Sequence, residues 1–362
     1  MDYKDTTAAH TLHAYLIPPT NLDDIYEEMT GIDWSSLSID CGYYTDARVS
    51  ATFTAVNDNY IPGAYIRITE ETEGTETELG TFAVNNDQTD NVNGADRRSF
   101  VLISQLHGLS LDYAPDSMVL GAGSMALRAF QTALKDAGKD EQDSITSNAN
   151  DYRFATSQVL EPGVSRLSRL YEIANLSGNR LDVDGHGRVT LKKYQTPDSR
   201  SPILRLSQDD ERGIIINGIT HTSNWGEIID SYILAYDYTT TEDDKTTSHH
   251  MYAVARNSQA PARGYTVSEY EVISELSPQT QTKLTQLAKE RAVKNSNERN
   301  EWNFSMKYLP GLWEGDVIEL ETVDADGRHD VNKCLVKSMT ITGPYLDTDI
   351  TLKATSGGDD DE

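Results

Sequence analysis

Residues 277–321 constrain the fold most, because they predict a long surface helix that runs directly into a strand. Ser277 and Pro278 are typical of a helix start: the hydroxyl can accept from a free backbone N–H, and proline at the first helical position gives up no hydrogen bond. Residues at three- and four-residue spacing then predict a narrow stripe on an otherwise polar helix, made by Leu284, Leu287, Ala288, Arg291 and Ala292. Such a helix lies on a surface, and this order of elements favours a scaffold over a catalyst.

The strand after this helix begins within the segment Pro310-Gly311-Leu312-Trp313-Glu314-Gly315-Asp316-Val317. From there the side chains alternate, with Val317, Glu319 and Glu321 on one side and Ile318, Leu320 and Thr322 on the other. Alternation with period two is typical of a sheet that has one solvated face.

The composition indicates a large and strongly acidic protein. A chain of 362 residues can hold several compact units, each burying roughly 60 to 70% of its unfolded surface. Its 58 Asp and Glu against 31 Lys and Arg give a formal net charge of −27. This balance argues against specific nucleic-acid binding, which needs clustered cations. The acidity fits a solubility surface or adaptation to an acidic or salt-rich habitat as well as it fits a functional surface.

Membrane and redox signals are weak. We find no run of the ~18 apolar residues that a membrane span needs and no signal-peptide pattern at the start. We therefore expect synthesis in the host cytoplasm, without stable insertion into a membrane. Cys41 and Cys334 are the only cysteines, too few for a disulfide framework or a cysteine zinc site. Two isolated reduced thiols are expected.

The first part of the chain, from Leu12 to about Ser110, predicts strands almost throughout. Short β-branched or aromatic runs separated by turn residues are typical of a sandwich or small barrel, and they cover residues 11–17, 37–44, 48–56, 64–70, 77–85 and 99–106. A hairpin is expected near residues 70–76, where five glutamates lie between Glu70 and Glu78. Like charges cannot pack together, so this tip should be solvated or face a partner of opposite charge.

The middle of the chain predicts two helices and a hairpin. Residues 124–137 and 165–176 each place apolar side chains on one face, and they end at Gly138 and Gly178, the left-handed residues that commonly terminate helices. The segment 180–191, RLDVDGHGRVTL, then predicts a hairpin with an Asp-Gly turn.

Two of these segments resemble the late control protein D family, the hub proteins of phage tail baseplates. The helix, glycine and hairpin of residues 165–191 are similar to the second domain of those proteins, and residues 277–320 are similar to their C-terminal pattern. The two matches occur in the correct order, more than 100 residues apart. The chain departs from the family in its acidity and in the poorly matched first barrel.

The resemblance implies a mainly β fold with some α (α+β), made of two tube-like β-barrel domains and two smaller mixed domains. We expect the first barrel in residues 1–115, a mixed helix and hairpin domain in 116–200, and the second barrel in 201–245 and 300–356. An inserted strand-helix domain is expected in 246–299, and residues 357–362 are a flexible acidic tail.

The carboxylate and histidine patterns do not predict a metal site. Asp182-x-Asp184-Gly185 and Asp324-x-Asp326-Gly327 begin like calcium loops but lack the glutamate at position twelve. An Asp-Gly pair between two strands is more typical of a hairpin turn. His249 and His250 are adjacent, so they point to opposite faces of a strand. His10 and His13 have helical spacing but precede the first expected strand and have no evident carboxylate partner.

Patterns for catalysis are also missing. There is no Gly-x-Ser-x-Gly segment, and Gly121-Ala122-Gly123-Ser124 lacks the lysine and third glycine of a phosphate-binding loop. A glycosidase needs two nearby carboxylates, but the four tryptophans that could line a sugar groove are dispersed: Trp34, Trp225, Trp302 and Trp313. We therefore predict no enzyme activity, no catalytic, cofactor-binding or metal-binding residue, and no cofactor.

The resemblance implies a structural protein of the virion tail, at the baseplate or tail tip. A hub closes the tail tube, connects it to the host-contacting tip and forms part of the DNA exit channel. Implied partners are further copies in a homotrimer, the tail tube or distal tail protein, the tail tip, fibre or spike protein, and as a further candidate the tape measure protein. Two alternatives stay open: a tail-associated cell-wall hydrolase and a host carbohydrate-binding receptor module.

Overall fold

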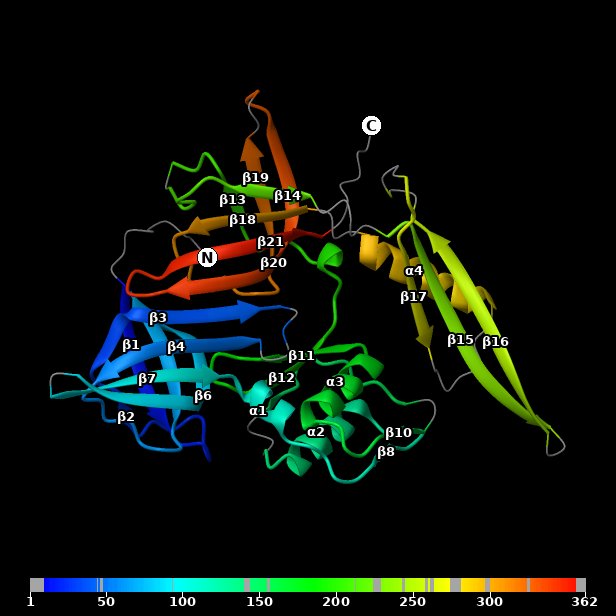
Figure 1. The fold of residues 1–362 in the computed structure, drawn as a ribbon, viewed down its shortest axis with the longest axis horizontal. Coiled ribbons are helices and arrows are strands. Elements are labelled where there is room, and N and C mark those ends of the chain that lie inside the picture. Colours follow the sequence, from blue (N-terminus) through cyan, green and yellow to red (C-terminus); the bar gives the residue numbers. More distant parts are fainter. Residues whose placement is uncertain are drawn as a thin grey trace.

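The protein is a mainly β chain with a large sheet, a helix-containing domain and a small lobe, which lie at the left, bottom centre and right of Figure 1. The computed structural model describes residues 10–43, 45, 48–92, 94–139, 144–154, 157–211, 213–223, 229–242, 245–257, 260, 264–273, 281–296, 300–323 and 326–355. The predicted class, mainly β with some α, is confirmed. None of the described helices is long and apolar enough to cross a membrane.

The first half of the main sheet comes from the N-terminal part of the chain. Its strands are β1 (His10–Ile17), β2 (Glu27–Glu28), β3 (Ile32–Gly42), β4 (Val49–Val56), β5 (Tyr65–Thr72), β6 (Thr75–Val92) and β7 (Ala95–Ile103). They pair in the order β3-β4-β7-β6-β5-β1-β2. Each expected run in this region lies in or overlaps one of these strands, although β7 ends at Ile103 and a helix begins at Gln105.

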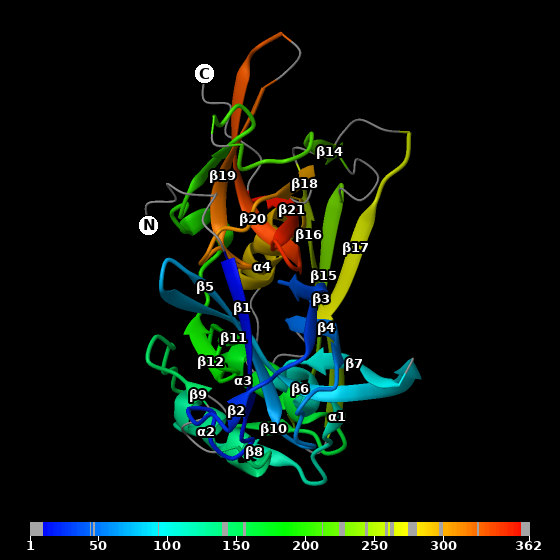
Figure 2. The same ribbon diagram turned by 90° about the vertical axis from the view of Figure 1, so that its left-hand side faces the viewer.

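The second half of the sheet is assembled from segments on both sides of the lobe. Its strands are β13 (Arg205–Ser207), β14 (Thr220–Ser223), β18 (Asn300–Met306), β19 (Val317–Val323), β20 (His329–Thr342) and β21 (Asp347–Ala354). The order is β14-β18-β21-β20, with β19 beside β20 and β13 beside β19. The β19–β20 hairpin projects from this half (Figures 1 and 2).

Strand β20 joins the two halves into one sheet of 13 strands. Its first part pairs with β19, and its last part pairs with β3, where Met339 lies opposite Cys41 and Ile341 opposite Ile39. One hydrophobic core runs across both halves, including Phe53 and Phe100 from the first and Trp302 from the second. We expected two separate barrels; in the described residues the pairing instead runs as one open path from β14 to β2, because β20 is long enough to pair with strands of both halves.

The mixed domain lies below the main sheet in Figure 1 and has its own core. It contains α1 (Gln105–Leu111), β8 (Met118–Leu120), α2 (Ala126–Asp136), β9 (Ser144–Ile145), β10 (Gln158–Leu160), α3 (Arg166–Leu176), β11 (Asn179–Val183), β12 (Val189–Lys193) and the 3-10 turn η2 (Pro197–Ser199). Both helix predictions are confirmed within two residues. Gly138 and Gly178 have φ of +72° and +66°, the left-handed conformation expected of them.

The lobe is a three-stranded sheet with one helix. It comprises β15 (Ser231–Glu242), β16 (Lys245–Arg256), β17 (Ser268–Ile273) and α4 (Gln281–Ser296), and its strand order is β16-β15-β17. The predicted stripe of Leu284, Ala288 and Ala292 is buried against this sheet, with Leu287 partly buried beside it. The predicted helix start at Ser277 and Pro278 and the side chain of Arg291 lie outside the described residues.

Two expectations require correction. We placed the end of a second-barrel segment at residue 245, but β15 pairs along its whole length with β16 and belongs to the lobe. We also expected the glutamates near the β5–β6 turn to be solvated or to face a partner of opposite charge. Glu73 and Glu76 are exposed, whereas Glu70 is fully buried, because antiparallel pairing with β1 brings His10 within 2.7 Å of its carboxylate.

Candidate functional site

The hairpin β11–β12 is where the mixed domain meets the main sheet, and the buried charged residues Arg48 and Glu314 lie beside it. The segment Gly311–Val317 approaches the hairpin from the second half of the sheet, and Tyr43 and Arg48 approach from the first half. We call this group of residues the junction: Tyr43, Arg48, Arg180, Asp182, Glu314 and Gly315. The two segments that carried the family resemblance therefore meet in space.

Two arginines hold the junction together through aromatic rings. The guanidinium carbon of Arg180 lies 3.7 Å from the centre of the Tyr43 ring, a close cation–π contact. Its Nη2 atom is 3.3 Å from Asp182 Oδ2, near enough for an ion pair although not aligned as a hydrogen bond. Arg48 lies 5.8 Å from the Tyr43 ring and 5.9 Å from the Tyr171 ring, and it donates to the Leu181 carbonyl at 3.2 Å.

Glu314 is the most perturbed carboxyl group of the junction. The pKa of Glu314 is raised from 4.5 to about 8, first by burial and then by the nearby charge of Asp182, while a backbone hydrogen bond, Arg180 and Arg48 act in the opposite direction. Its Oε2 atom is buried and has no hydrogen-bond partner among the described residues. The carboxyl group is therefore mostly protonated at neutral pH.

The backbone at the entry to strand β19 requires a glycine at position 315. Its φ is +85°, which L side chains rarely adopt, and a Cβ atom there would lie 2.7 Å from the Tyr43 ring and 2.8 Å from Arg180 Nη1. The Gly315 carbonyl accepts from Arg200 at 2.6 Å. Asp316 accepts from the Trp313 N–H at 2.8 Å. These bonds fix the backbone that presents Glu314 to the hairpin.

The turn of the hairpin makes a second contact, with strand β6. Thr81 Oγ1 donates to the Gly185 carbonyl at 2.8 Å, and His186 Nδ1 lies 2.5 Å from Glu78 Oε2. A Cβ atom on Gly185 would lie 2.8 Å from the Glu78 side chain, so this glycine permits the close approach. Between the two contacts is a cavity of about 20 Å³ lined by residues that include Val183, Gly185 and Glu314. That volume holds about one water molecule and no substrate.

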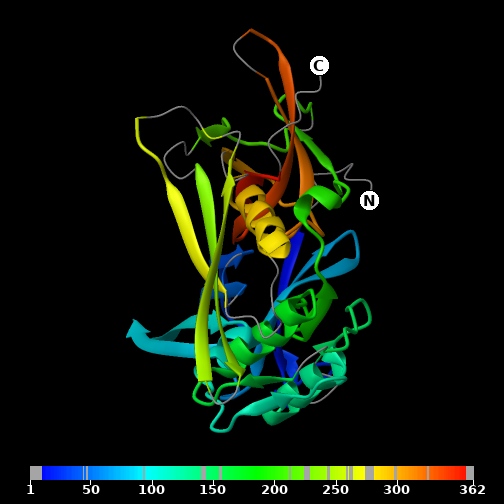
Figure 3. The same ribbon diagram turned by 90° about the vertical axis from the view of Figure 1, so that its right-hand side faces the viewer.

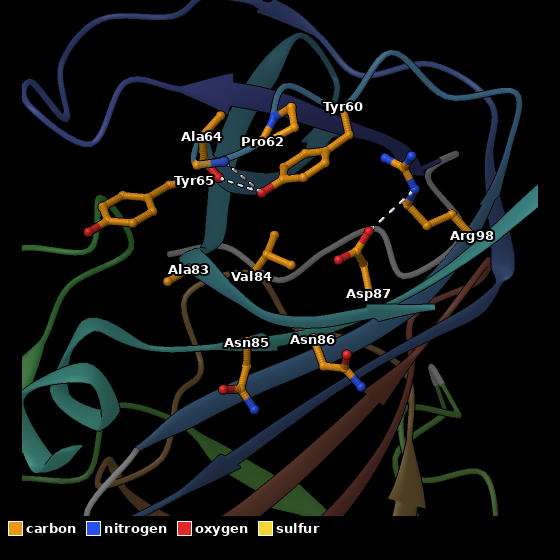
Figure 4. Close-up of a pocket in the computed structure, with 11 residues that line it drawn as sticks. Tyr60, Pro62, Ala64, Tyr65, Ala83, Val84, Asn85, Asn86, Asp87 and Arg98 are labelled. Atoms are coloured by element: carbon orange, nitrogen blue, oxygen red, sulfur yellow. Dashed lines mark hydrogen bonds and ion pairs between the residues drawn. The ribbon is translucent and has the colours of Figure 1, made fainter. Parts of the chain in front are cut away.

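A larger pocket, of about 420 Å³, opens beside strand β6 (Figure 4). Val84 and Asp87 extend toward Tyr60, whereas Asn85 and Asn86 extend from the other side of the strand. Arg98 lies 3.2 Å from Asp58, 3.5 Å from Asp87 and 5.9 Å from the centre of the Tyr60 ring. The size is that of a small-ligand pocket.

The lining of this pocket offers little for catalysis. Its residues are Tyr60, Pro62, Gly63, Ala64, Tyr65, Ala83, Val84, Asn85, Asn86, Asp87 and Arg98. They include one carboxylate, so the pair that a glycosidase needs is missing from the lining, and they include no serine, cysteine, histidine or lysine. The pocket can bind a molecule but does not present a nucleophile and base.

The aspartates that begin like calcium loops have structural roles or are exposed. Asp182 pairs with Arg180, and Asp184 Oδ1 accepts from the Arg188 N–H at 2.7 Å, closing the hairpin turn. Asp326 is exposed, and Asp324 lies outside the described residues. Within the described part of the chain, no group of three or more histidines, cysteines or carboxylates is arranged to hold a metal ion.

The histidines correct one expectation. His10 and His13 both lie in β1 and both have carboxylate partners, Glu70 at 2.7 Å and Glu28 at 2.8 Å. The hydrogen bond that the Glu28 carboxylate accepts from His13 raises the pKa of His13, against the lowering effect of burial. We missed these partners because they depend on the pairing of β1 with β5 and β2. His250 is exposed, and the His249 side chain lies outside the described residues.

The remaining candidates are explained by packing. Trp302 is buried and Trp34 and Trp313 pack against the same core, while Trp225 lies outside the described residues. Cys41 and Cys334 are free, as expected, and both are buried. Burial raises the pKa of Cys334 to about 12.

The glycine segment before α2 is a turn. Ser124 Oγ donates to the Gly121 carbonyl at 2.6 Å, and the helix begins without a side-chain cap.

Comparison with known proteins identifies the fold. No protein-family profile and no curated protein matches the sequence. Among solved structures, the tail protein of Neisseria meningitidis MC58 has a TM-score of 0.68 at 13% identity, covering 95% of this chain and 96% of that one. The tail protein of prophage MuSo2 from Shewanella oneidensis has a TM-score of 0.65 at 12% identity, with coverages of 96% and 99%. The chain has the fold of these tail proteins.

A third similar structure extends the comparison. The prophage tail protein gp18 of Listeria monocytogenes has a TM-score of 0.53 at 9% identity, with 94% of each chain covered. The similarity thus includes the main sheet, the mixed domain and the lobe together. At these identities it concerns the fold alone.

Proposed function

We propose that this chain is a tail hub, a structural protein of the virion that closes the tail tube and connects it to the host-contacting tip. The observation that carries the proposal is the end-to-end likeness to tail proteins, at TM-scores of 0.68 and 0.65 over at least 95% of this chain. The junction supports it, because its charged side chains and the Tyr43 ring join the mixed domain to both halves of the main sheet. Such contacts suit a rigid connector. The proposed location is the baseplate or tail tip.

The hub assembles as a homotrimer. The main sheet has two halves joined at β20, so three chains would present six similar units to the sixfold tube that the family resemblance implies. The described sheet ends at β2, β13 and β14, each of which pairs along one edge with a single strand. Contacts in a closed ring would cover such edges, which otherwise promote aggregation.

The acidity serves the channel. Three chains at −27 each carry −81 formal charges, and part of this charge faces the lumen through which DNA leaves. DNA carries one negative charge per ~1.7 Å of axis, so an acidic wall releases it where a basic wall would retain it. Above and below the ring, the proposed partners are the tail tube or distal tail protein, the tape measure protein and the tip, fibre or spike protein.

The proposed role is not enzymatic. The lining of the β6 pocket includes one carboxylate and no serine, cysteine, histidine or lysine. The cavity beside the hairpin is lined by Asp184 and Glu314, but at about 20 Å³ it has no room for a substrate. The competing reading as a cell-wall hydrolase predicts that the isolated chain degrades purified peptidoglycan. A hub leaves peptidoglycan intact, so release of soluble fragments by the purified chain would contradict the proposal.

A carbohydrate-binding receptor module is the second competing function, and the β6 pocket with Tyr60, Tyr65 and Arg98 is where a sugar would bind. Binding of the isolated chain to host cells, lost in Arg98→Ala, would favour that module. A hub alone should not bind host cells.

Light scattering with and without tube protein tests the ring itself, and a stable monomer in both samples would count against a hub.

A further inference from the structure

The lobe has one covered and one uncovered sheet face. Helix α4 packs on one side of the strands (Figure 3), against a small core separate from that of the main sheet. The side chains of this core come from both layers: Ile229, Tyr232, Leu234, Tyr236, Ala253, Ala255, Leu284, Ala288 and Ala292. Neighbouring positions on each strand point the other way, so strand geometry places the next set of side chains on the face opposite α4.

That opposite face is apolar and exposed. Cross-strand pairing aligns two rows, Val254 with Ile233 and Tyr270, and Tyr252 with Ala235 and Val272. Four of these side chains are about half exposed or more: Tyr252 at 61%, Tyr270 at 58%, Val272 at 51% and Val254 at 47%. Adjacent exposed apolar side chains on one sheet face are typical of an interaction surface rather than a solvated one. We call these six residues the docking face.

The charge of the lobe is unlike that of the rest of the chain. Residues 229–296 contain nine Asp and Glu and seven Lys and Arg, a balance of −2, so the remaining residues carry −25 of the total −27. Arg256 follows Val254 on the same face of β16 and is exposed. A nearly neutral lobe can approach an acidic surface of another copy with little repulsion, whereas two acidic surfaces would repel each other.

A complementary surface lies on the mixed domain. Val119 on β8 and Val159 on β10 are directly opposite each other and are 63% and 53% exposed. The carbonyl groups of Asp116 and Glu161 both accept from the guanidinium of Arg169, which places these two exposed acidic residues close together at the end of the ribbon. This β8–β10 ribbon thus offers an apolar pair beside carboxylates, matching an apolar face beside Arg256.

We propose that the docking face of one chain binds the β8–β10 ribbon of a second copy of this chain. The contact joins two different surfaces, so repeated head to tail it can close a ring. This inference rests on the proposed homotrimer and specifies one contact within it. Arg256 faces the carboxylates of Asp116 and Glu161, and Tyr270 packs against the two valines.

The test measures the dissociation constant of the full-length oligomer by mass photometry over a concentration series. Tyr270→Asp places a charge in the docking face and should weaken assembly by about tenfold or more, as expected for a buried interface tyrosine. Tyr345→Asp is the matched control, because Tyr345 is 78% exposed in the β20–β21 turn and lies outside the docking face. It should leave assembly unchanged. Tyr270→Ser, which adds no charge, should give a smaller loss in the same direction.

A charge exchange identifies the partner surface. Arg256→Glu and Glu161→Lys should each weaken assembly, and the two together should restore it, because the pair then attracts again across the contact. Full assembly of Tyr270→Asp and Tyr270→Ser, or a double variant weaker than either single one, would overturn the inference while leaving the trimer in place. A wild-type chain that stays monomeric even with tube protein would instead overturn the proposed function, and this inference with it.

Discussion

Glu314→Gln is the most informative single substitution, because it removes the titration of a buried carboxyl group while keeping its size. Glu314 is only 9% exposed, and its folded pKa of about 8 lies above the unfolded value of 4.5. The folded chain therefore holds the proton more tightly than the unfolded chain. The stability linked to this proton is fully present below pH 4.5 and is lost as the pH rises through about 8.

The size of the effect follows from the pKa difference. At 1.36 kcal/mol per pKa unit, raising the pH from about 5 to about 8 should destabilise the wild type relative to Glu314→Gln by on the order of 3 kcal/mol. Glutamine is neutral at both values, so its stability should not follow this titration. The variant should be close to wild type at about pH 5 and clearly more stable at about pH 8.

Urea unfolding followed by tryptophan fluorescence measures the difference, and Trp313 is the neighbour of Glu314 in the chain. Glu73→Gln is the matched control, because Glu73 is exposed at the β5–β6 turn and lies outside the junction. Its unfolding midpoint should follow the wild type at every pH. Parallel pH profiles of wild type and Glu314→Gln would refute the argument that burial keeps this carboxyl group protonated.

Three further substitutions test the scaffold. Gly178→Val should destabilise the chain by about 1–3 kcal/mol and reduce ring yield, because φ at this position is +66°; normal assembly in size-exclusion chromatography would contradict this. Gly315→Ala should be at least as damaging, since its Cβ would meet Tyr43 at 2.7 Å, and a melting temperature equal to wild type would argue against the close approach. Asp184→Asn should change stability by less than about 1 kcal/mol, because an amide oxygen can still accept from the Arg188 N–H. A chelator should leave the melting temperature unchanged, and a fall would indicate a metal site.

The sequence predicted local elements well, since their signals lie within a few residues. Ser165 is the N-cap of α3, where its side chain accepts from the Ser168 N–H, and Gly178 ends the helix as predicted. The hairpin of residues 180–191 was predicted from its Asp-Gly turn and is formed by β11 and β12. Each of these features depends on short-range backbone chemistry.

Pairing between distant segments was not predictable in the same way. Period-two alternation identifies β15 as a strand but does not say whether it pairs with β16 or with the main sheet, which is why the boundary at residue 245 was wrong. The partners of His10 and His13 depend on cross-strand register for the same reason. No local sequence pattern indicated that Glu314 is buried, because its burial depends on a hairpin more than 100 residues away.

The central claim, that the chain is a tail hub, is tested most directly by particle imaging of the purified chain alone and mixed with tail tube protein. The account predicts a threefold ring with a central opening, a net acidic lumen and end-on attachment to the tube. A monomer in both samples, or a ring with a neutral or basic lumen that does not bind the tube, would contradict it.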